Sequence, residues 1–86
     1  MSEICRFLGI VIAMFGDDHN PPHFHIRYGE FKALIAIDGS IIKGTMPKSV
    51  LKNVFRWMEE HHDELLENWR RMQEGEEIIN IEPLDK

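Results

Sequence analysis

The stretch DDHNPPHFHIRYGEF, residues 17–31, concentrates the side chains of this chain that are best able to do chemistry. It holds three of the five histidines, together with carboxylates, an arginine and two adjacent prolines. His23 and His25 are two positions apart, so on a β-strand their rings leave the same face, about 6.5–7 Å apart at the backbone. Two imidazoles so placed can share a metal ion or cooperate in proton transfer.

A metal site is the first interpretation of this stretch. The candidate ligands come from one loop and the strand that follows it: Asp17, Asp18, His19, His23 and His25. Histidine with a carboxylate suits zinc or iron(II), because both metals accept imidazole nitrogen together with carboxylate oxygen. Histidines that only face solvent or bond the backbone are the simpler alternative, since short motif matches often arise without function.

Acid–base catalysis without a metal is the second interpretation. His23 and His25 would act as base and acid, while Arg27 and Lys32 would clamp a phosphate of RNA. Imidazole titrates near neutral pH, as such a role requires. The stretch therefore predicts either zinc or iron(II) binding or a histidine-dependent ribonuclease or hydrolase, and the residues leave both open.

A hairpin is expected to hold these side chains. Residues 23–28 and 31–37 alternate between polar and apolar side chains, as half-buried strands do. Gly29-Glu30 between them fits a two-residue turn, with Gly supplying the positive φ. This turn predicts the facing pairs Tyr28–Phe31, Ile26–Ala33 and Phe24–Ile35 on the core face, and His25–Leu34, His23–Ala36 and Arg27–Lys32 on the other face. The last pair is like-charged and needs solvent, an acidic neighbour or an anion.

The rest of the N-terminal half also favours strands. Residues 4–15 are rich in Ile, Val and Phe, with a bulge or bend expected at Gly9. Residues 41–44 follow the turn Asp38-Gly39-Ser40 and predict a short strand. A last short strand is expected at residues 78–81, stopped by Pro83.

Helical spacing of apolar side chains runs through residues 47–74. One helix of that length would span about 42 Å, whereas a domain of this size is only about 30 Å across. We therefore expect two helices, or one kinked helix, with a break near residues 60–63 and Asp63 as a cap. The predicted fold class is α+β: a small antiparallel meander, then the helices packed on one sheet face, then the short C-terminal strand.

Length and composition bound the setting. The 86 residues fit a single domain, residues 1–86. The net charge of −5 argues against a broad nucleic-acid surface but leaves a small basic site open. Cys5 is the only cysteine, which excludes an internal disulfide and suits a reducing compartment. The apolar run at residues 8–15 is too short to span a membrane and no secretory leader is evident, so a cytoplasmic location is expected.

A partner surface is a further possibility. Trp57 falls off the main helical stripe, where it could cover the last strand or serve as an exposed anchor for another protein. Glu60 and Glu64 belong to an acidic helical face that could meet a basic partner. A homodimer stays open.

Three segments resemble a known family: EICRFLGIVIAMFGDDHNPPHFHIRYGEFKALIAIDG, LLENWRRMQEGE and IEPL. They resemble the small bacterial family with a domain of unknown function, DUF4160, from Glu3 to Leu84. The run His19-Asn20-Pro21-Pro22-His23-Phe24-His25 and the pair Asn68-Trp69 are the most specific parts. The resemblance assigns no catalytic role to the histidines. It implies a gene encoded beside another small domain, as in toxin–antitoxin-like cassettes.

The leading functional expectation is therefore a small cytosolic interaction or regulatory module, one component of such a two-gene cassette. Its partner would be a small protein encoded by a neighbouring gene. The rival expectation is the metal- or histidine-dependent ribonuclease or hydrolase that uses His19, His23 and His25.

Overall fold

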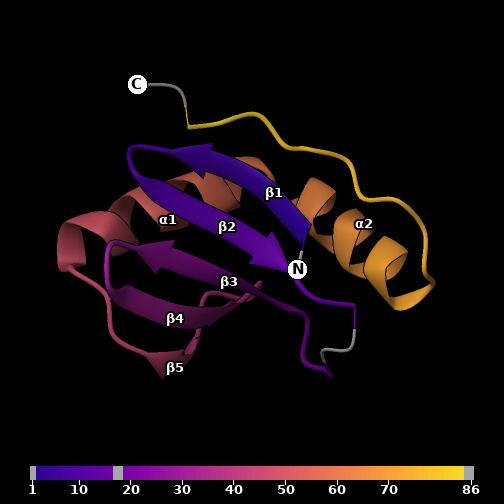
Figure 1. Cartoon of the computed structure of the whole chain (residues 1–86), viewed down its shortest axis with the longest axis horizontal. Coiled ribbons are helices and arrows are strands. Elements are labelled where there is room, and N and C mark those ends of the chain that lie inside the picture. The colour runs from indigo at the N-terminus through magenta and orange to yellow at the C-terminus, as the bar shows by residue number, and fades with distance from the viewer. Residues whose placement is uncertain (1, 17–18, 85–86) are drawn as a thin grey trace.

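Five β-strands precede two α-helices in the computed structural model, which describes residues 2–16 and 19–84. The strands are β1 (Ser2–Phe7), β2 (Ile10–Met14), β3 (His23–Tyr28), β4 (Phe31–Ala36) and β5 (Ile41–Gly44). The helices are α1 (Lys48–Glu60) and α2 (His62–Gln73). After α2, residues 76–84 run as an irregular, drawn-out segment, which we name the C-terminal strap (Figure 1, yellow).

The strands form one antiparallel meander in the order β1-β2-β3-β4-β5. Both helices lie on the same side of this sheet (Figure 1). The predicted α+β fold, a meander followed by two helices on one face, is thereby confirmed. No helix of the described chain covers the other side, which we name the open face.

The core lies between the sheet and the helices. Strand residues supply its sheet half, at alternate positions except on β1, where the register shifts between Glu3 and Cys5: Ile4, Phe7, Ile10, Ile12, Met14, Phe24, Ile26 and Ile35. Residues three and four apart on the helices supply the other half: Val50, Val54, Trp57, Met58, Leu65 and Trp69. These spacings bring one face of each element into the interior, as the periodicity of the sequence predicts for these residues apart from Trp57, which falls beside the predicted stripe.

The β3–β4 hairpin forms with the predicted register. All six facing pairs from His23–Ala36 to Tyr28–Phe31 are present, and Gly29 has a positive φ of 58° in the turn. The expected core face is wrong only at its end, where Tyr28 and Phe31 are exposed. Both residues lie beside the turn. Their side chains point to the core side of the sheet, as the alternation along β3 and β4 requires, but no helix of the described residues covers them there.

The expected single strand over residues 4–15 is wrong. The chain reverses at Leu8-Gly9, and β1 and β2 pair as a hairpin in which Phe7 faces Ile10. Leu8 and Gly9 both have positive φ, 51° and 78°, as a two-residue turn with the twist of the strands requires. The sequence predicts a bulge or bend at Gly9 and not this turn, in which Leu8 adopts a positive φ that is uncommon for leucine.

The predicted break in the helical region is confirmed at His61, between α1 and α2. The residue at the start of α2 is His61 rather than the expected Asp63, which lies within the first turn. No side-chain hydrogen bond caps this helix start. Asp63 instead contributes a negative charge near the helix N-terminus, a favourable position relative to the helix dipole.

The C-terminal strap replaces the short strand expected at residues 78–81. It makes a single backbone hydrogen bond to the sheet, from the Ile81 N–H to the Ile4 carbonyl at 2.9 Å. Side chains fix the rest of it: Asn68 bonds both backbone groups of Ile79, and the Trp57 Nε1–H donates to the Glu82 carbonyl at 2.8 Å. Hydrogen bonds from side chains to the strap backbone therefore replace the backbone–backbone hydrogen bonds that a strand would make.

Cys5 is buried on the core side of β1. Burial raises the pKa of its thiol to about 11. The thiol is therefore protonated at neutral pH and is not a nucleophile. Within residues 2–16 and 19–84, neither helix has the length and hydropathy that crossing a bilayer would require.

Candidate functional site

Two rows of side chains cross the open face of the sheet. The strand register aligns Arg6, Val11, Arg27 and Lys32 in the first row. It aligns Glu3, Ala13, His25, Leu34 and Lys43 in the second. Residues directly opposite one another on paired strands have Cβ atoms about 4.5–5.5 Å apart, so each row is a continuous band of contacts.

Positive charge collects in these rows. They hold four of the ten lysines and arginines in the chain, namely Arg6, Arg27, Lys32 and Lys43, although the net charge of the chain is −5. Glu3 is the acidic residue of the two rows, and it is paired with Arg6 at 2.8 Å. The hydrogen bond from Arg6, assisted by the charge of Arg27, holds the pKa of Glu3 below its usual value. The remaining cations face outward from an otherwise acidic molecule.

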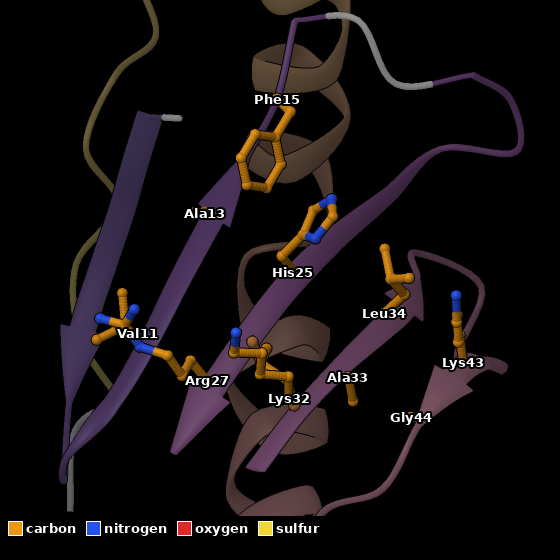
Figure 2. A pocket seen from close by; sticks show the side chains of 11 residues that line it. Val11, Ala13, Phe15, His25, Arg27, Lys32, Ala33, Leu34, Lys43 and Gly44 are labelled. Atoms are coloured by element: carbon orange, nitrogen blue, oxygen red, sulfur yellow. The ribbon is translucent and has the colours of Figure 1, made fainter. Parts of the chain in front are cut away.

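A groove of about 370 Å³ lies along this cationic band. Its apolar floor comes from small and branched side chains, Val11 and Ala13 on β2 and Leu34 on β4. Arg27, Lys32 and Lys43 stand along its length, and Arg27 extends from β3 across Val11 (Figure 2). The groove is deep at Ala13 because the side chain of alanine is small. A larger residue there would fill the space between β1 and β3.

Phe15 and His25 form the aromatic end of the groove. Their rings meet edge to face with centroids 4.1 Å apart, and they point toward one another in Figure 2. Such edge-to-face contacts stabilise a ring pair by about 0.5–1.5 kcal/mol. His25 is half-buried in this position. Its imidazole is therefore held at the groove rather than swinging in solvent.

His23 is buried and does not line the groove. Its ring lies 5.2 Å from the ring of Trp69 on α2. The His23 Nδ1 is 2.8 Å from the carbonyl oxygen of Pro21, so this nitrogen carries the proton and donates it. The His23 and His25 rings are 5.5 Å apart. The two histidines are neighbours, as predicted, but only His25 lines the groove.

The predicted metal set is not assembled by the described residues. His19 is exposed in the loop before β3, and no group of three His, Cys, Asp or Glu within residues 2–16 and 19–84 could hold a metal ion. Asp17 and Asp18, the predicted oxygen ligands, lie outside the described residues. The zinc or iron(II) assignment stays a prediction.

The predicted partner-binding residues do not share one surface, because Trp57 is buried whereas Glu60 and Glu64 are exposed. Trp57 is fully buried, with its ring 5.8 Å from Phe7 and 6.1 Å from Phe24. The expectation of an exposed Trp57 anchor is therefore wrong, and the alternative that it covers the C-terminal segment is the observed one. Glu60 and Glu64 are exposed, on α1 and α2 respectively, and Glu64 accepts a 2.6 Å hydrogen bond from His61.

Sequence reasoning placed His25, Arg27 and Lys32 together correctly. It missed Arg6, Phe15 and Lys43, which the sheet brings to the same face. The signal for Arg6 was the turn at Leu8-Gly9, since that reversal sets Arg6 beside Val11. Lys43 depends on a register shift between β4 and β5, for which the sequence carries no signal.

Comparison with known proteins gives one match. A family model described as Domain of unknown function (DUF4160) covers residues 9–70. The matched region begins at the β1–β2 turn and ends within α2, so it includes the whole groove. Neither the curated proteins nor the solved structures contain a match.

Proposed function

Because the chain belongs to the DUF4160 family, whose description names no activity, its open face is the basis for assigning a function, and we propose that this face binds single-stranded RNA. The observation that carries the proposal is the clustering of Arg27, Lys32 and Lys43 around a groove with an aromatic end, in a chain of net charge −5. Cations replace the counterions of a phosphate backbone, and that exchange supplies most of the affinity of such complexes.

The shape of the site favours RNA over an acidic peptide. A sheet that is covered by helices on one side and bare on the other offers a flat platform, and bases splayed from a single strand stack on aromatic side chains of such platforms. Phe15 and His25 supply the rings, and the apolar floor of Val11 and Leu34 receives the face of a base. The proposal places the protein in the cytoplasm, where single-stranded RNA is abundant.

The energetic cost of the Arg27–Lys32 pair also supports an anionic ligand. These like charges face one another directly across β3 and β4, an arrangement that destabilises a sheet by roughly 0.2–1 kcal/mol. A phosphate between them would turn this repulsion into two attractive contacts. Sites that bind a ligand commonly carry such a cost in the free protein.

Lys32→Glu should therefore weaken RNA binding while leaving the fold as stable as before or stabilising it. The substitution puts a carboxylate opposite Arg27, which adds roughly 0.2–1 kcal/mol of cross-strand attraction and removes positive charge from the groove. We expect the affinity for a fluorescently labelled single-stranded RNA to fall at least about tenfold, and the slope of log K against log salt to shrink by about 1. Fluorescence anisotropy over a salt series, with thermal unfolding in parallel, measures both effects.

Lys52→Glu is the matched control. It makes the same change in net charge on the exposed surface of α1, behind the sheet, so it should reduce affinity far less. Equal losses in the two variants would reduce the effect to net charge and contradict a site on the open face. Tighter binding to a poly-glutamate peptide than to RNA of equal charge would overturn the RNA assignment in favour of a protein partner.

A second candidate is the interaction module expected from the sequence, and the edge strand β5 favours it. β5 is the last strand of the sheet, and its Ile41 and Ile42 are 49% and 45% exposed. An edge strand with exposed apolar side chains can accept a strand from another protein. The small protein encoded by a neighbouring gene, expected for a two-gene cassette, would be that partner.

Co-expression with the product of the neighbouring gene tests this candidate. We expect one stable complex in size-exclusion chromatography with light scattering, and we expect Ile42→Lys to weaken it because a charge would be buried at the junction. Leu66→Lys, a matched change at an exposed apolar residue of α2, should leave the complex intact. Recovery of both proteins as separate monomers would contradict the second candidate.

A further inference from the structure

His25 is the imidazole that the sheet presents to the groove. It lies on β3 between the apolar floor and the cations, with Arg27 two positions further along the same face of the same strand. Lys32 faces Arg27 directly on β4 and is thus diagonal to His25. Diagonal neighbours in a sheet are about 7–8 Å apart at the backbone, which long side chains bridge easily.

The register brings these three side chains to one part of the groove, where a phosphodiester group could lie between them. A phosphate held by Arg27 and Lys32 would have its bridging oxygens within reach of side chains on both β3 and β4, since opposite residues are only about 4.5–5.5 Å apart at Cβ. The ribose on one side of that phosphate then lies toward His25, at the aromatic end of the groove. In that arrangement the His25 imidazole would lie near a 2′-hydroxyl, and the Lys32 ammonium group near the following 5′-oxygen.

We propose that the protein cleaves the RNA bound on its open face, with His25 as general base and Lys32 as general acid. His25 accepts the proton of the 2′-hydroxyl as the 2′-oxygen attacks phosphorus. The bond from phosphorus to the 5′-oxygen breaks, and Lys32 donates a proton to the leaving oxygen. The products are a 2′,3′-cyclic phosphate and a 5′-hydroxyl, and exchange with water returns both side chains to their starting states.

Arg27 supplies the remaining requirement of this reaction. Negative charge grows on the non-bridging phosphate oxygens as the fifth bond to phosphorus forms, and a fixed cation stabilises it. The guanidinium of Arg27 lies over Val11, above the groove floor (Figure 2). The nucleophile is the 2′-hydroxyl of the substrate itself, so the protein needs to supply only the proton transfers and the positive charge.

His23 acts through His25 and is a positioning residue. Its Nδ1–H bond to the Pro21 carbonyl and its contact with Trp69 fix one ring, and that ring lies 5.5 Å from His25. With Phe15 on another side of the imidazole, His25 is held in one orientation. The predicted pair of catalytic histidines is thus divided into one that would contact RNA and one that supports it.

To test this, excess protein is incubated with an end-labelled single-stranded RNA in buffer containing EDTA. Binding and cleavage are then measured separately. Binding is measured with the same sequence fully 2′-O-methylated, which has no proton for His25 to accept. We expect both RNAs to bind and only the unmodified RNA to be cut, leaving 2′,3′-cyclic phosphate ends. With each protein at a concentration that saturates its RNA binding, His25→Asn should cut the RNA at least about 100-fold more slowly than wild type, as loss of a general base predicts.

The outcomes separate this inference, which rests on the proposed function, from that function. RNA that is bound but stays intact overturns the cleavage and leaves RNA binding in place, whereas failure to bind 2′-O-methyl RNA overturns both. Cutting that EDTA abolishes, that leaves 5′-phosphate ends, or that persists at the same rate in identically purified His25→Asn protein also overturns it. His23→Gln should slow cutting by a smaller factor than His25→Asn; an equal or larger loss would overturn the division of roles.

Discussion

Trp57→Ala should lower the free energy of unfolding by about 3–5 kcal/mol, because it removes the largest fully buried side chain of the core. Trp57 contacts Phe7 on β1 and Phe24 on β3, so the cavity would open between the sheet and α1. It would also leave the Glu82 carbonyl without the indole N–H that it accepts at 2.8 Å. A domain of this length has a stability of only about 5–13 kcal/mol, so the variant should be close to unfolding at physiological temperature.

Urea denaturation followed by circular dichroism measures this loss. Trp57→Phe is the control, since it keeps most of the ring packing and loses chiefly the hydrogen bond to Glu82, with an expected cost of about 1–2 kcal/mol. The difference between the two variants isolates the packing. A Trp57→Ala loss no larger than that of Trp57→Phe would contradict the central position of Trp57 in the core.

Trp57 also shows where helical periodicity stops being informative. On a helical wheel it falls beside the main stripe of apolar residues. The chain breaks at His61, and the strap returns over β1 to close the side of α1 that Trp57 occupies (Figure 1). A segment that is far away in the sequence and has no regular structure leaves no periodic signal.

The β3–β4 hairpin was predictable residue by residue because two independent constraints agree. Side-chain alternation fixes which residues share a face, and a two-residue turn at Gly29-Glu30 fixes which residues are opposite. A shift of one position would turn Phe24 and Ile26 out of the core. The register of six pairs therefore followed from local chemistry.

The first hairpin was not predictable in the same way. Residues 10–14 are apolar on both faces, with Val11 and Ala13 flooring the groove and Ile10 and Ile12 in the core. A strand of this kind shows no alternation, so the turn at Leu8-Gly9 was hidden inside one apolar run. The apolar residues on the open face of β2 thus have two consequences. They remove the alternation that would have revealed the turn, and they form the floor of the groove.

The net charge of −5 does not reveal the charge of the open face, for a related reason. Net charge sums over the surface, whereas binding depends on the field of one face. The acidic residues lie mainly on α1, α2 and the strap, behind and beside the sheet, while Arg6, Arg27, Lys32 and Lys43 share the open face. The order of strands decides this segregation, and the composition does not reveal it.

Asn68→Ala should lower the free energy of unfolding by about 2–3 kcal/mol through loss of the strap rather than of the core. The Asn68 side chain is buried, and it pairs with Ile79 as a strand would: its Nδ2 donates to the Ile79 carbonyl at 2.7 Å, and its Oδ1 accepts from the Ile79 N–H at 2.9 Å. Both backbone groups lose their partner in the variant. Ile81 and Leu84, which the strap buries, should then detach more often.

Asn53→Ala on α1 is the matched control, because it makes the same chemical change in a helix and gains the same helix propensity, up to roughly 0.6 kcal/mol. Its stability should stay within about 0.5 kcal/mol of wild type. Limited proteolysis should cut residues 76–84 of Asn68→Ala faster than those of wild type or Asn53→Ala. Equal cutting rates would contradict the role of Asn68 as the clamp of the strap.

RNA binding by Asn68→Ala, measured at a temperature where it stays folded, should match that of wild type. Asn68 lies on α2, and the strap that it holds runs along β1 and the helices, whereas the groove residues project from the opposite face of the sheet. Lys32→Glu should behave in the inverse manner, with stability kept and binding lost. If one of these variants lost both properties while folded, the separation between a stabilised helical side and a ligand-binding open face would fail.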